Sequence, residues 1–407
     1  MRVLQLTVYP IEQPRHGGQA RCANMRSALQ AQGHEVRTLA VYEPEHYGGD
    51  AVGPHDIGFP GHSTYRKQAL PLCVDYASGD FLAADDGARN HLVDVATAFD
   101  PDVLLLEHPW HWPAALHLRE RSARPPGIVY SSHNVEAPLK AAILTGFEPE
   151  AAGRIVALIE ARERALCAAA DLCIAVTDAD AEVLRGYGAR SVIVASNGIV
   201  ERRVDERHLR DWQWFLGGKR FALFVGSAYP PNAVGFWDMM GPSLAFLPPD
   251  ERVLAVGGVC KLLVEHPTYL QWQGVNAARL ETAGVQSEDA LGVLLTLASC
   301  IVLPITFGGG SNIKTAEAIF ANRPVIGTTH SLRGYEFARR LPHVYCADDA
   351  TEFRRLVRLA LDERLPAAEA ADDPALRESV LWRHTLAGVP GAMAALRPRA
   401  GAAALLE

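Results

Sequence analysis

Two kinds of segment alternate along almost all of the sequence. Short apolar runs rich in β-branched residues, such as RVLQLTVY at 2–9 and DLCIAVT at 171–177, are followed by longer stretches such as AAGRIVALIEARERALCAAA at 151–170. Parallel strands that are covered on both faces have continuous apolar runs, and helices must connect them. The alternation therefore predicts α/β domains with doubly wound parallel sheets.

The alternation is interrupted twice. Residues 43–85 are rich in glycine, proline and histidine, and they predict a long surface loop or a small insertion. Residues 201–218 carry many charges and end in two glycines, which is typical of a linker. We therefore predict two Rossmann-like domains that face each other across a cleft, at 1–205 and 219–365. A C-terminal helical tail at 366–407 is expected to return to the first domain.

Charge and hydropathy narrow the classes of partner. The formal net charge of the 407 residues is −8, whereas a nucleic-acid-binding protein is expected to have a basic face. No run approaches the roughly 18 apolar residues of a membrane-spanning helix. Seven dispersed cysteines without a C-x-x-C pair are typical of reduced thiols in the cytosol. We expect a cytoplasmic protein that does not bind nucleic acid, and contact with the inner face of a membrane stays open.

A glycine-rich loop lies between a predicted strand at 300–305 and a predicted helix at 311–322. Free N–H groups and the helix dipole at such a junction favour an anion, and a lysine and a glutamate follow on one helix face. These groups would suit a nucleotide diphosphate, and the candidate binding residues are Gly309, Gly310, Ser311, Asn312, Lys314 and Glu317. A solvated Lys–Glu pair after a flexible loop is the alternative. A P-loop is disfavoured because Ile313 replaces its last glycine.

Polar residues also follow the first-half strands. Gly17 and Gly18 open a predicted helix, where they would either approach a ligand or serve an ordinary β–α turn. His133 ends the strand at 127–133, at the carboxyl edge where sites form, so it is either an active-site contact or a structural residue. The neighbouring strand ends in a group that could line an acceptor pocket or pack as a strand–helix junction. This group is Glu107, His108 and Trp110.

One short motif imitates the D-x-D sequence of metal-dependent sugar transferases. Asp178 and Asp180 follow a predicted strand, but they stand at a predicted helix start with Thr177 or Asp178 as the N-cap. Cysteine and histidine show no paired metal-ligand spacing. We therefore expect no metal and no other cofactor.

Four segments resemble GT-B glycosyltransferases of the family-4-like group. They are FGGGSNIKTAEAIFANRPVIGTT at 307–329, LFVGSAYPPNAVGF at 223–236, PRHGGQAR at 14–21 and SSHNVE at 131–136. The resemblance implies a hexosyltransferase-type enzyme that moves a sugar from a nucleotide-sugar donor, with retention of anomeric configuration. The acceptor would be a sugar, a lipid-linked molecule or another hydroxyl compound.

The resemblance also implies roles for individual residues. Glu317 would bind the donor ribose, and Lys314 with the N–H groups of 309–312 would hold the diphosphate. Gly226 and Ser227 would lie nearby, and His133 and Lys314 would be the catalytic residues. This sequence departs from many relatives because Gly309 replaces a glutamate, and because GSAYPPN lacks an Arg and Lys pair. Lys314 is then the main phosphate cation.

Three other functions are alternatives to sugar transfer. A nucleotide-sugar epimerase has the same fold, and it would alter the donor without transferring it. A non-catalytic nucleotide-sugar-binding protein stays open. A Rossmann oxidoreductase is disfavoured because no G-x-G-x-x-G follows the first strand.

Overall fold

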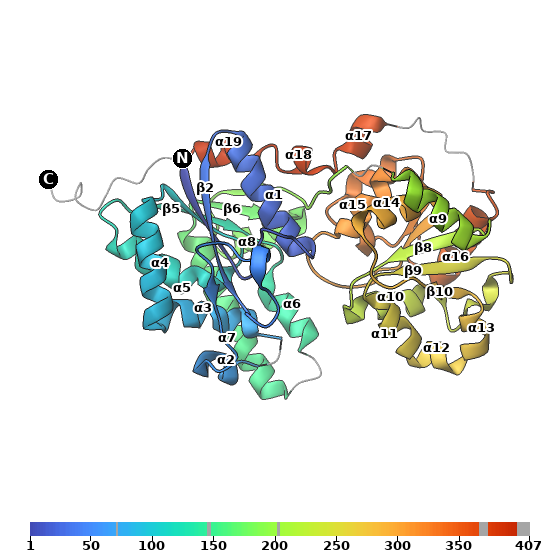
Figure 1. Cartoon of the computed structure of the whole chain (residues 1–407), viewed down its shortest axis with the longest axis horizontal. Helices are drawn as coiled ribbons and strands as arrows, with labels where there is room; N and C mark the ends of the chain where they lie inside the picture. Colours follow the sequence, from blue (N-terminus) through green and yellow to red (C-terminus); the bar gives the residue numbers. More distant parts are fainter. Residues whose placement is uncertain (71, 145–147, 202–203, 366–372, 397–407) are drawn as a thin grey trace. The chain divides into compact units, whose positions relative to one another are not determined.

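A computed structural model describes residues 1–70, 72–144, 148–201, 204–365 and 373–396 (Figure 1). Contacts divide the chain into two compact units. The first comprises Met1–Ser196 together with the C-terminal residues from Thr385, and the second comprises Asn197–His384. Each unit has its own parallel sheet, as the alternating sequence predicted.

The first unit is built on seven parallel strands among the described residues, in the order β3-β2-β1-β4-β5-β6-β7 (Figure 1). The strands are β1 (Arg2–Thr7), β2 (Glu35–Tyr42), β3 (Ile57–Gly58), β4 (Val103–Leu106), β5 (Gly127–Ser131), β6 (Leu172–Ala175) and β7 (Val192–Val194). The chain winds outward from β1 to β3 and then returns to the other side of β1. Val3 of β1 consequently pairs with both Val36 and Val103. Ligands of such sheets bind at the carboxyl ends of the strands beside this reversal.

Helices cover the sheet of the first unit. They are α1 (Gly17–Ala31), α2 (Thr64–Gln68), α3 (Val74–Ala84), α4 (Asp86–Phe99), α5 (Trp112–Arg121), α6 (Glu136–Ile143), α7 (Pro149–Ala169), α8 (Asp178–Gly186) and α19 (Val389–Ala394). The helix predicted to open at Gly17 and Gly18 corresponds to α1, and the one predicted at 151–170 corresponds to α7. Leu4, Leu104 and Ile128 of successive strands are fully buried in one hydrophobic cluster.

The interpretation of residues 43–85 as a surface loop was wrong. They contain β3, which pairs with β2, and the helices α2 and α3. Phe59 and Phe81 of this segment are buried in the main core, and their ring centroids lie 4.9 Å apart. Glycine, proline and histidine obscure the pattern because the strand is only two residues long and the connections are short.

The second unit has six parallel strands among the described residues, in the order β10-β9-β8-β11-β12-β13. They are β8 (Phe221–Val225), β9 (Arg252–Val256), β10 (Leu280–Thr282), β11 (Cys300–Leu303), β12 (Val325–Gly327) and β13 (Val344–Cys346). Along β8, Phe221 and Leu223 belong to one hydrophobic cluster, whereas Ala222 and Phe224 belong to another. Both faces are therefore buried, which explains the continuous apolar run of this strand.

The helices of the second unit follow the same winding. They are α9 (Glu206–Leu216), α10 (Pro230–Met240), α11 (Val259–Glu265), α12 (Pro267–Gln271), α13 (Gln273–Ala277), α14 (Glu288–Leu297), α15 (Ile313–Phe320), α16 (Ala350–Leu361), α17 (Pro374–Glu378) and α18 (Trp382–Thr385). Ser287 caps α14, because its Oγ accepts a hydrogen bond from the Ala290 N–H. The helix predicted at 311–322 starts two residues later than expected: α15 begins at Ile313 and its N-cap is Asn312, not Ser311.

The boundary between the units precedes the predicted linker at 201–218. Much of that segment forms α9, which packs on α14 of the second unit. Of the tail predicted at 366–407, residues 366–372 and 397–407 lie outside the described residues. Ile199, near the start of the second unit, forms a β-bridge with Leu381 of the predicted tail, and both residues belong to that unit. The last described helix, α19, packs on α1 (Figure 1).

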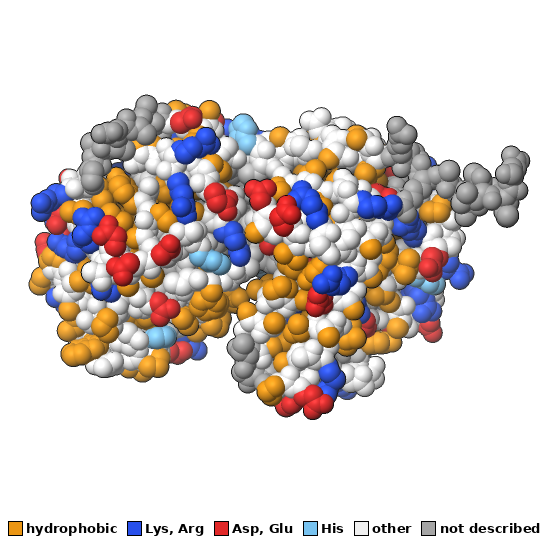
Figure 2. Space-filling model, turned by 180° about the vertical axis from the view of Figure 1, so that it is seen from behind, with side chains coloured by type: hydrophobic (Ala, Val, Ile, Leu, Met, Phe, Trp, Pro, Cys, Tyr) orange, Lys and Arg blue, Asp and Glu red, His pale blue; other side chains and the backbone are white. Residues whose placement is uncertain are grey.

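On the molecular face drawn in Figure 2, lysine and arginine side chains are interspersed with aspartate and glutamate. This mixture agrees with the formal net charge of −8. Among the described residues, no helix combines the length and the apolar composition that crossing a bilayer requires.

Candidate active site

The glycine-rich loop of the second unit follows β11. Gly308 has φ +130° and Gly310 has φ +63°, backbone conformations that side-chain-bearing residues rarely adopt. The carbonyl oxygen of Gly310 accepts hydrogen bonds from Arg333 Nε at 2.9 Å and Nη2 at 2.5 Å. Gly309 lies between the two glycines and is half-buried. Arg333 therefore anchors the loop in a conformation that only glycines reach easily.

The helix after this loop presents its N-terminus without a side-chain cap. Asn312, the N-cap of α15, makes no side-chain cap hydrogen bond. Ser311 instead bonds to Asn197: its Oγ accepts from the Asn197 N–H at 3.2 Å, and its carbonyl accepts from Asn197 Nδ2 at 3.0 Å. The first N–H groups of a helix and its dipole attract anions, so this end of α15 suits a phosphate.

Lys314 and Glu317 lie on α15 beside that N-terminus. Lys314 Nζ donates to Asn232 Oδ1, and Asn232 Nδ2 donates to the Ser227 carbonyl at 3.0 Å. Burial lowers the pKa of Lys314 to about 8, although the charge of Glu317 acts in the opposite direction. Glu317 is itself 7% exposed. Asn232 therefore links the predicted residue Lys314 on α15 with the predicted residue Ser227 after β8.

Gly226 and Ser227 follow β8, which is paired with β11. The Gly226 N–H donates to the Val256 carbonyl at 2.9 Å, and its own carbonyl accepts from the Val259 N–H at 3.1 Å. A Cβ on Gly257 would approach the Gly226 oxygen to 2.3 Å, so the two backbones meet closely. The loops after β8 and β11 therefore lie together where the strand order reverses, the position expected for a ligand in such a sheet.

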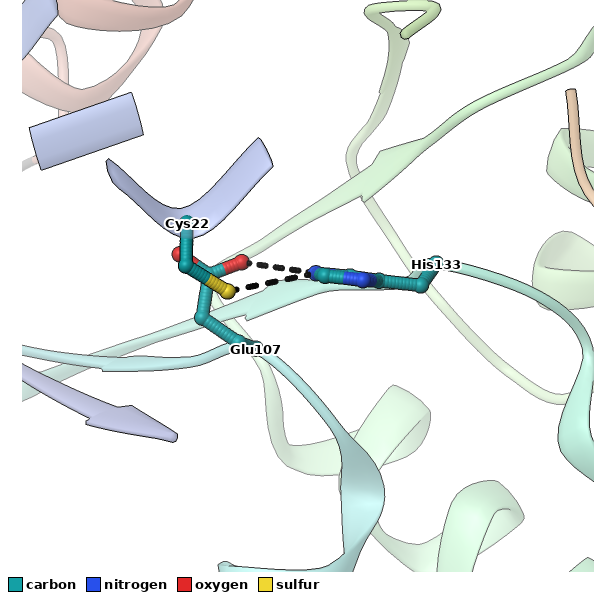
Figure 3. A group of neighbouring side chains, drawn as sticks. All are labelled: Cys22, Glu107 and His133. Carbon is teal, nitrogen blue, oxygen red and sulfur yellow. Dashed lines mark hydrogen bonds and ion pairs between the residues drawn. The ribbon is translucent and has the colours of Figure 1, made fainter. Parts of the chain in front are cut away.

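A buried polar cluster lies in the first unit. Glu107 follows β4, His133 follows β5 and Cys22 lies on α1 (Figure 3). His133 Nε2 is 3.1 Å from Glu107 Oε2 and 3.7 Å from Cys22 Sγ. Gln5, a polar residue inside the apolar strand β1, donates from Nε2 to Glu107 Oε1 at 2.6 Å. The structure thus brings the predicted residues Glu107 and His133 into direct contact.

Burial sets the protonation of this cluster. It lowers the pKa of His133 well below its usual value, and the nearby guanidinium of Arg21 acts in the same direction. Burial also raises the pKa of Glu107, against the hydrogen bond from Gln5 and the charge of Arg21. His133 is therefore a neutral imidazole at neutral pH, able to orient a hydroxyl but carrying no charge.

The side chains of this cluster are of the types that bind metal ions. The thiol of Cys22, the carboxylate of Glu107 and the imidazole of His133 lie within 4.8 Å of one another. Thiolate, carboxylate and imidazole are all zinc ligands. The positive charge of Arg21 acts on both Glu107 and His133, and it opposes a divalent cation at this position. The contacts that the structure shows are hydrogen bonds and an ion-pair geometry between these side chains.

His108 and Trp110 occupy different environments. His108 lines a cavity of about 390 Å³ together with Tyr9, and its ring centroid lies 4.3 Å from that of His133. Trp110 is fully buried and packs against Ala137 and Ile159, so its side chain does not line this cavity. Its place corresponds to the alternative of a packed strand–helix junction.

Gly17 and Gly18 form the first turn of α1. A Cβ on Gly18 would come within 2.2 Å of the Tyr9 hydroxyl oxygen. Packing against Tyr9 therefore requires glycine at this position whether or not a ligand binds there. Gly17 is exposed.

The D-x-D imitation is a helix start, as predicted. Thr177 is the N-cap of α8, and its Oγ1 accepts a hydrogen bond from the Asp180 N–H at 3.0 Å. Asp178 and Asp180 are the acidic residues of the first turn, where their negative charges interact favourably with the helix dipole.

Sequence reasoning missed several supporting residues. Gln5 could have been noticed because a glutamine interrupts an apolar strand, and Asn232 because it lies in a motif already compared with other enzymes. Cys22 and Arg333 gave no local signal. Their contacts, Cys22 with His133 and Arg333 with Gly310, join segments that are distant in sequence.

Comparisons with known proteins concern the family and the fold. Residues 16–203 match the family model described as Glycosyltransferase Family 4. No curated protein sequence is significantly similar to the chain.

Several solved structures have the same fold. Anabaena HepE, solved with UDP and glucose, has 14% sequence identity and a TM-score of 0.66, over 97% of this chain and 99% of HepE. Sucrose-phosphate synthase from Thermosynechococcus elongatus has 14% identity and a TM-score of 0.64, over 97% of each chain. WaaG, a glycosyltransferase involved in lipopolysaccharide biosynthesis, has 17% identity and a TM-score of 0.60, over 96% of this chain and 98% of WaaG. Residues 16–203 therefore match the Glycosyltransferase Family 4 model, and the chain as a whole has the GT-B fold of these solved glycosyltransferase structures.

Proposed function

We propose that the protein transfers a hexosyl group from a nucleotide-sugar donor to an acceptor hydroxyl, with retention of anomeric configuration and without a metal. The second unit holds the donor and the first unit holds the acceptor. The observation that carries this proposal is the contact between Lys314 and Asn232 beside the uncapped N-terminus of α15. This contact holds an ammonium group beside the first N–H groups of the helix, and both kinds of group would suit a diphosphate.

The donor would be held by charge at one end and by hydrogen bonds at the other. Lys314 and the N–H groups of Gly309 to Asn312 would bind the diphosphate, and Glu317 would accept hydrogen bonds from ribose hydroxyls. The loop of Gly226 and Ser227 would lie beside them. The UDP bound to HepE supports a UDP-sugar as the first donor to test.

The reaction needs no protein nucleophile. The bond between sugar C1 and the diphosphate oxygen breaks, and the acceptor oxygen bonds to C1 on the same face. The acceptor proton passes to an oxygen of the departing diphosphate. Lys314 and the helix N-terminus stabilise that leaving group, and neutral His133, held by Glu107, orients the sugar.

The direct test is turnover of UDP-hexoses with a panel of sugar, glycolipid and other hydroxyl acceptors. Product formation with the anomeric configuration of the donor, seen in the C1 proton coupling by NMR, is expected. An inverted product would contradict retention while leaving transfer intact.

The same donors and acceptors distinguish two alternative functions. Incubation of the donor with enzyme alone would give an epimerised sugar if the protein is an epimerase. Tight donor binding without turnover across the acceptor panel would favour a binding protein. We further propose a cytoplasmic location, with peripheral contact at the inner face of a membrane if the acceptor is lipid-linked.

A further inference from the structure

The cavity of the first unit has the size and lining of a small-molecule site. Its volume is about 390 Å³, and it lies at the carboxyl end of β1, where Tyr9 and His108 form part of its wall. Tyr47 and Phe59 add aromatic surface. A concave site with aromatic walls and a few polar groups is the usual form of a ligand pocket.

The charges around this cavity are unevenly distributed. Glu43, Asp75 and Glu136 contribute three carboxyl groups to the lining. Lys140 is the one lysine or arginine among the lining residues that the structure describes. Apart from the lining histidines, Lys140 is therefore the described lining side chain that could give an anionic ligand its counter-charge.

The ammonium group of Lys140 already donates hydrogen bonds to three acceptors. Nζ lies 2.9 and 2.7 Å from the two carboxylate oxygens of Asp75, and 2.5 Å from the Leu72 carbonyl oxygen. A lysine ammonium has three protons, and these three acceptors account for all of them. The side chain is also 6% exposed, so Lys140 cannot turn to a ligand without breaking a buried ion pair.

The other lining groups favour hydroxyls. Glu43 pairs with Arg66, which lies outside the lining. Burial and the neighbouring Glu163 raise the pKa of Glu136 well above its usual value, which favours the neutral form of its carboxyl. A neutral carboxyl both donates and accepts hydrogen bonds, as do imidazole groups such as that of His108.

Arg15 also lies outside the cavity lining and contacts two of the lining residues. Arg15 donates to the His46 carbonyl at 3.2 Å and lies over the Tyr47 ring at 5.5 Å. It is exposed, so solvent would screen its effect on a ligand inside.

We infer that this cavity takes the acceptor as an uncharged sugar, with neither phosphate nor carboxylate on the part that enters. The inference rests on the proposed function, in which the first unit holds the acceptor. A phosphate group would lose its hydration without gaining a free cation, whereas sugar hydroxyls find acceptors and donors at His108 and Glu136. The Lys140–Asp75 pair is then a specificity device that keeps phosphorylated sugars out.

The test compares matched sugars on the wild-type protein. Glucose, mannose and N-acetylglucosamine are each measured against their 6-phosphates by saturation-transfer NMR titration. At least one unphosphorylated sugar should bind, at least tenfold more tightly than its 6-phosphate. Tighter binding of any 6-phosphate than of its parent sugar would overturn the inference.

A charge variant sharpens the test. Asp75→Asn leaves Lys140 without its carboxylate partner, and it should increase affinity for glucose 6-phosphate at least tenfold. Asp80→Asn is the matched control, because Asp80 lies on the same helix α3 and pairs with Arg162 outside the cavity lining. It should leave the sugar preference unchanged. A thermal melt of each variant shows whether it is folded, and the wild-type comparison decides the inference even if Asp75→Asn is not.

Failure of this inference can be told apart from failure of the proposed function. If none of the sugars binds while UDP still binds, the cavity is not a sugar site, and the donor site in the second unit stands. If UDP-sugar turnover is absent altogether, the proposed function itself fails.

Discussion

Glu107 and His133 leave the neighbouring strands β4 and β5 and meet with 3.1 Å between Oε2 and Nε2. Gln5 holds the other carboxylate oxygen of Glu107. The carboxylate therefore fixes the orientation of the imidazole from a position that is completely buried. Glu107 acts here as a positioning residue for His133.

The variant Glu107→Gln should lower turnover without weakening nucleotide binding. Removing a charge-assisted hydrogen bond costs about 1.5–3 kcal/mol, which corresponds to roughly 10- to 150-fold in kcat. The measurement is steady-state kinetics beside UDP calorimetry. The exposed Glu120→Gln on α5 is the control. Equal kcat values for the two variants would show that the contact only stabilises the fold.

Lys314 predicts a pH dependence of nucleotide affinity. Its pKa of about 8 means that the ammonium is charged below this pH and is lost as the pH rises through it. Affinity for UDP should therefore fall as the pH rises above about 8, whereas Lys314→Arg should remove this fall because a guanidinium stays charged. Calorimetric titrations across this range check it. A flat profile in the wild type would contradict the role of the ammonium.

The segment at 43–85 should contribute to stability as part of the core. Phe59 is buried against Phe81, so Phe59→Ala should reduce the free energy of unfolding by about 3–5 kcal/mol. The exposed His62→Ala in the same segment should change it by no more than about 0.5 kcal/mol. Urea denaturation measures both. A small effect of Phe59→Ala would mean that the segment is only a surface insertion.

Catalysis is predicted to proceed without a divalent metal. Lys314 and the N-terminus of α15 take the place of a cation at the leaving diphosphate, and Arg21 opposes a cation at the cluster of Cys22, Glu107 and His133. Turnover should survive dialysis against a strong chelator, and elemental analysis should find no stoichiometric zinc. Zinc that disappears in Cys22→Ser, or activity restored only by magnesium or manganese, would contradict this prediction.

The sequence predicted those features that depend on local pattern. The residues of β8 alternate between two buried clusters, so the strand is a continuous apolar run that can be recognised in the sequence. The loop could be predicted from Gly308 and Gly310, because its positive φ angles favour glycine at these positions. Thr177 showed the helix cap because capping involves residues three apart.

Contacts between distant segments gave no such signal. Lys140 and Asp75 are 65 residues apart, and nothing in either neighbourhood predicts their ion pair. Lys314 was recognised, but its partner Asn232 lies 82 residues earlier. For Trp110 the sequence leaves an acceptor pocket and a packed strand–helix junction open, because periodicity does not show which helices cover it.

The most direct test of the account is calorimetric titration of UDP, GDP, dTDP and ADP into the wild-type protein and Lys314→Ala. Lys261→Ala, an exposed lysine that also belongs to the second unit, is the control. We predict that at least one nucleotide binds the wild type and the control equally, and that Lys314→Ala weakens this binding by roughly 10- to 150-fold, the value of a charge-assisted hydrogen bond. Equal affinity of Lys314→Ala and the wild type for every nucleotide that binds, or no binding by the folded wild type, would contradict the placement of the donor diphosphate at α15.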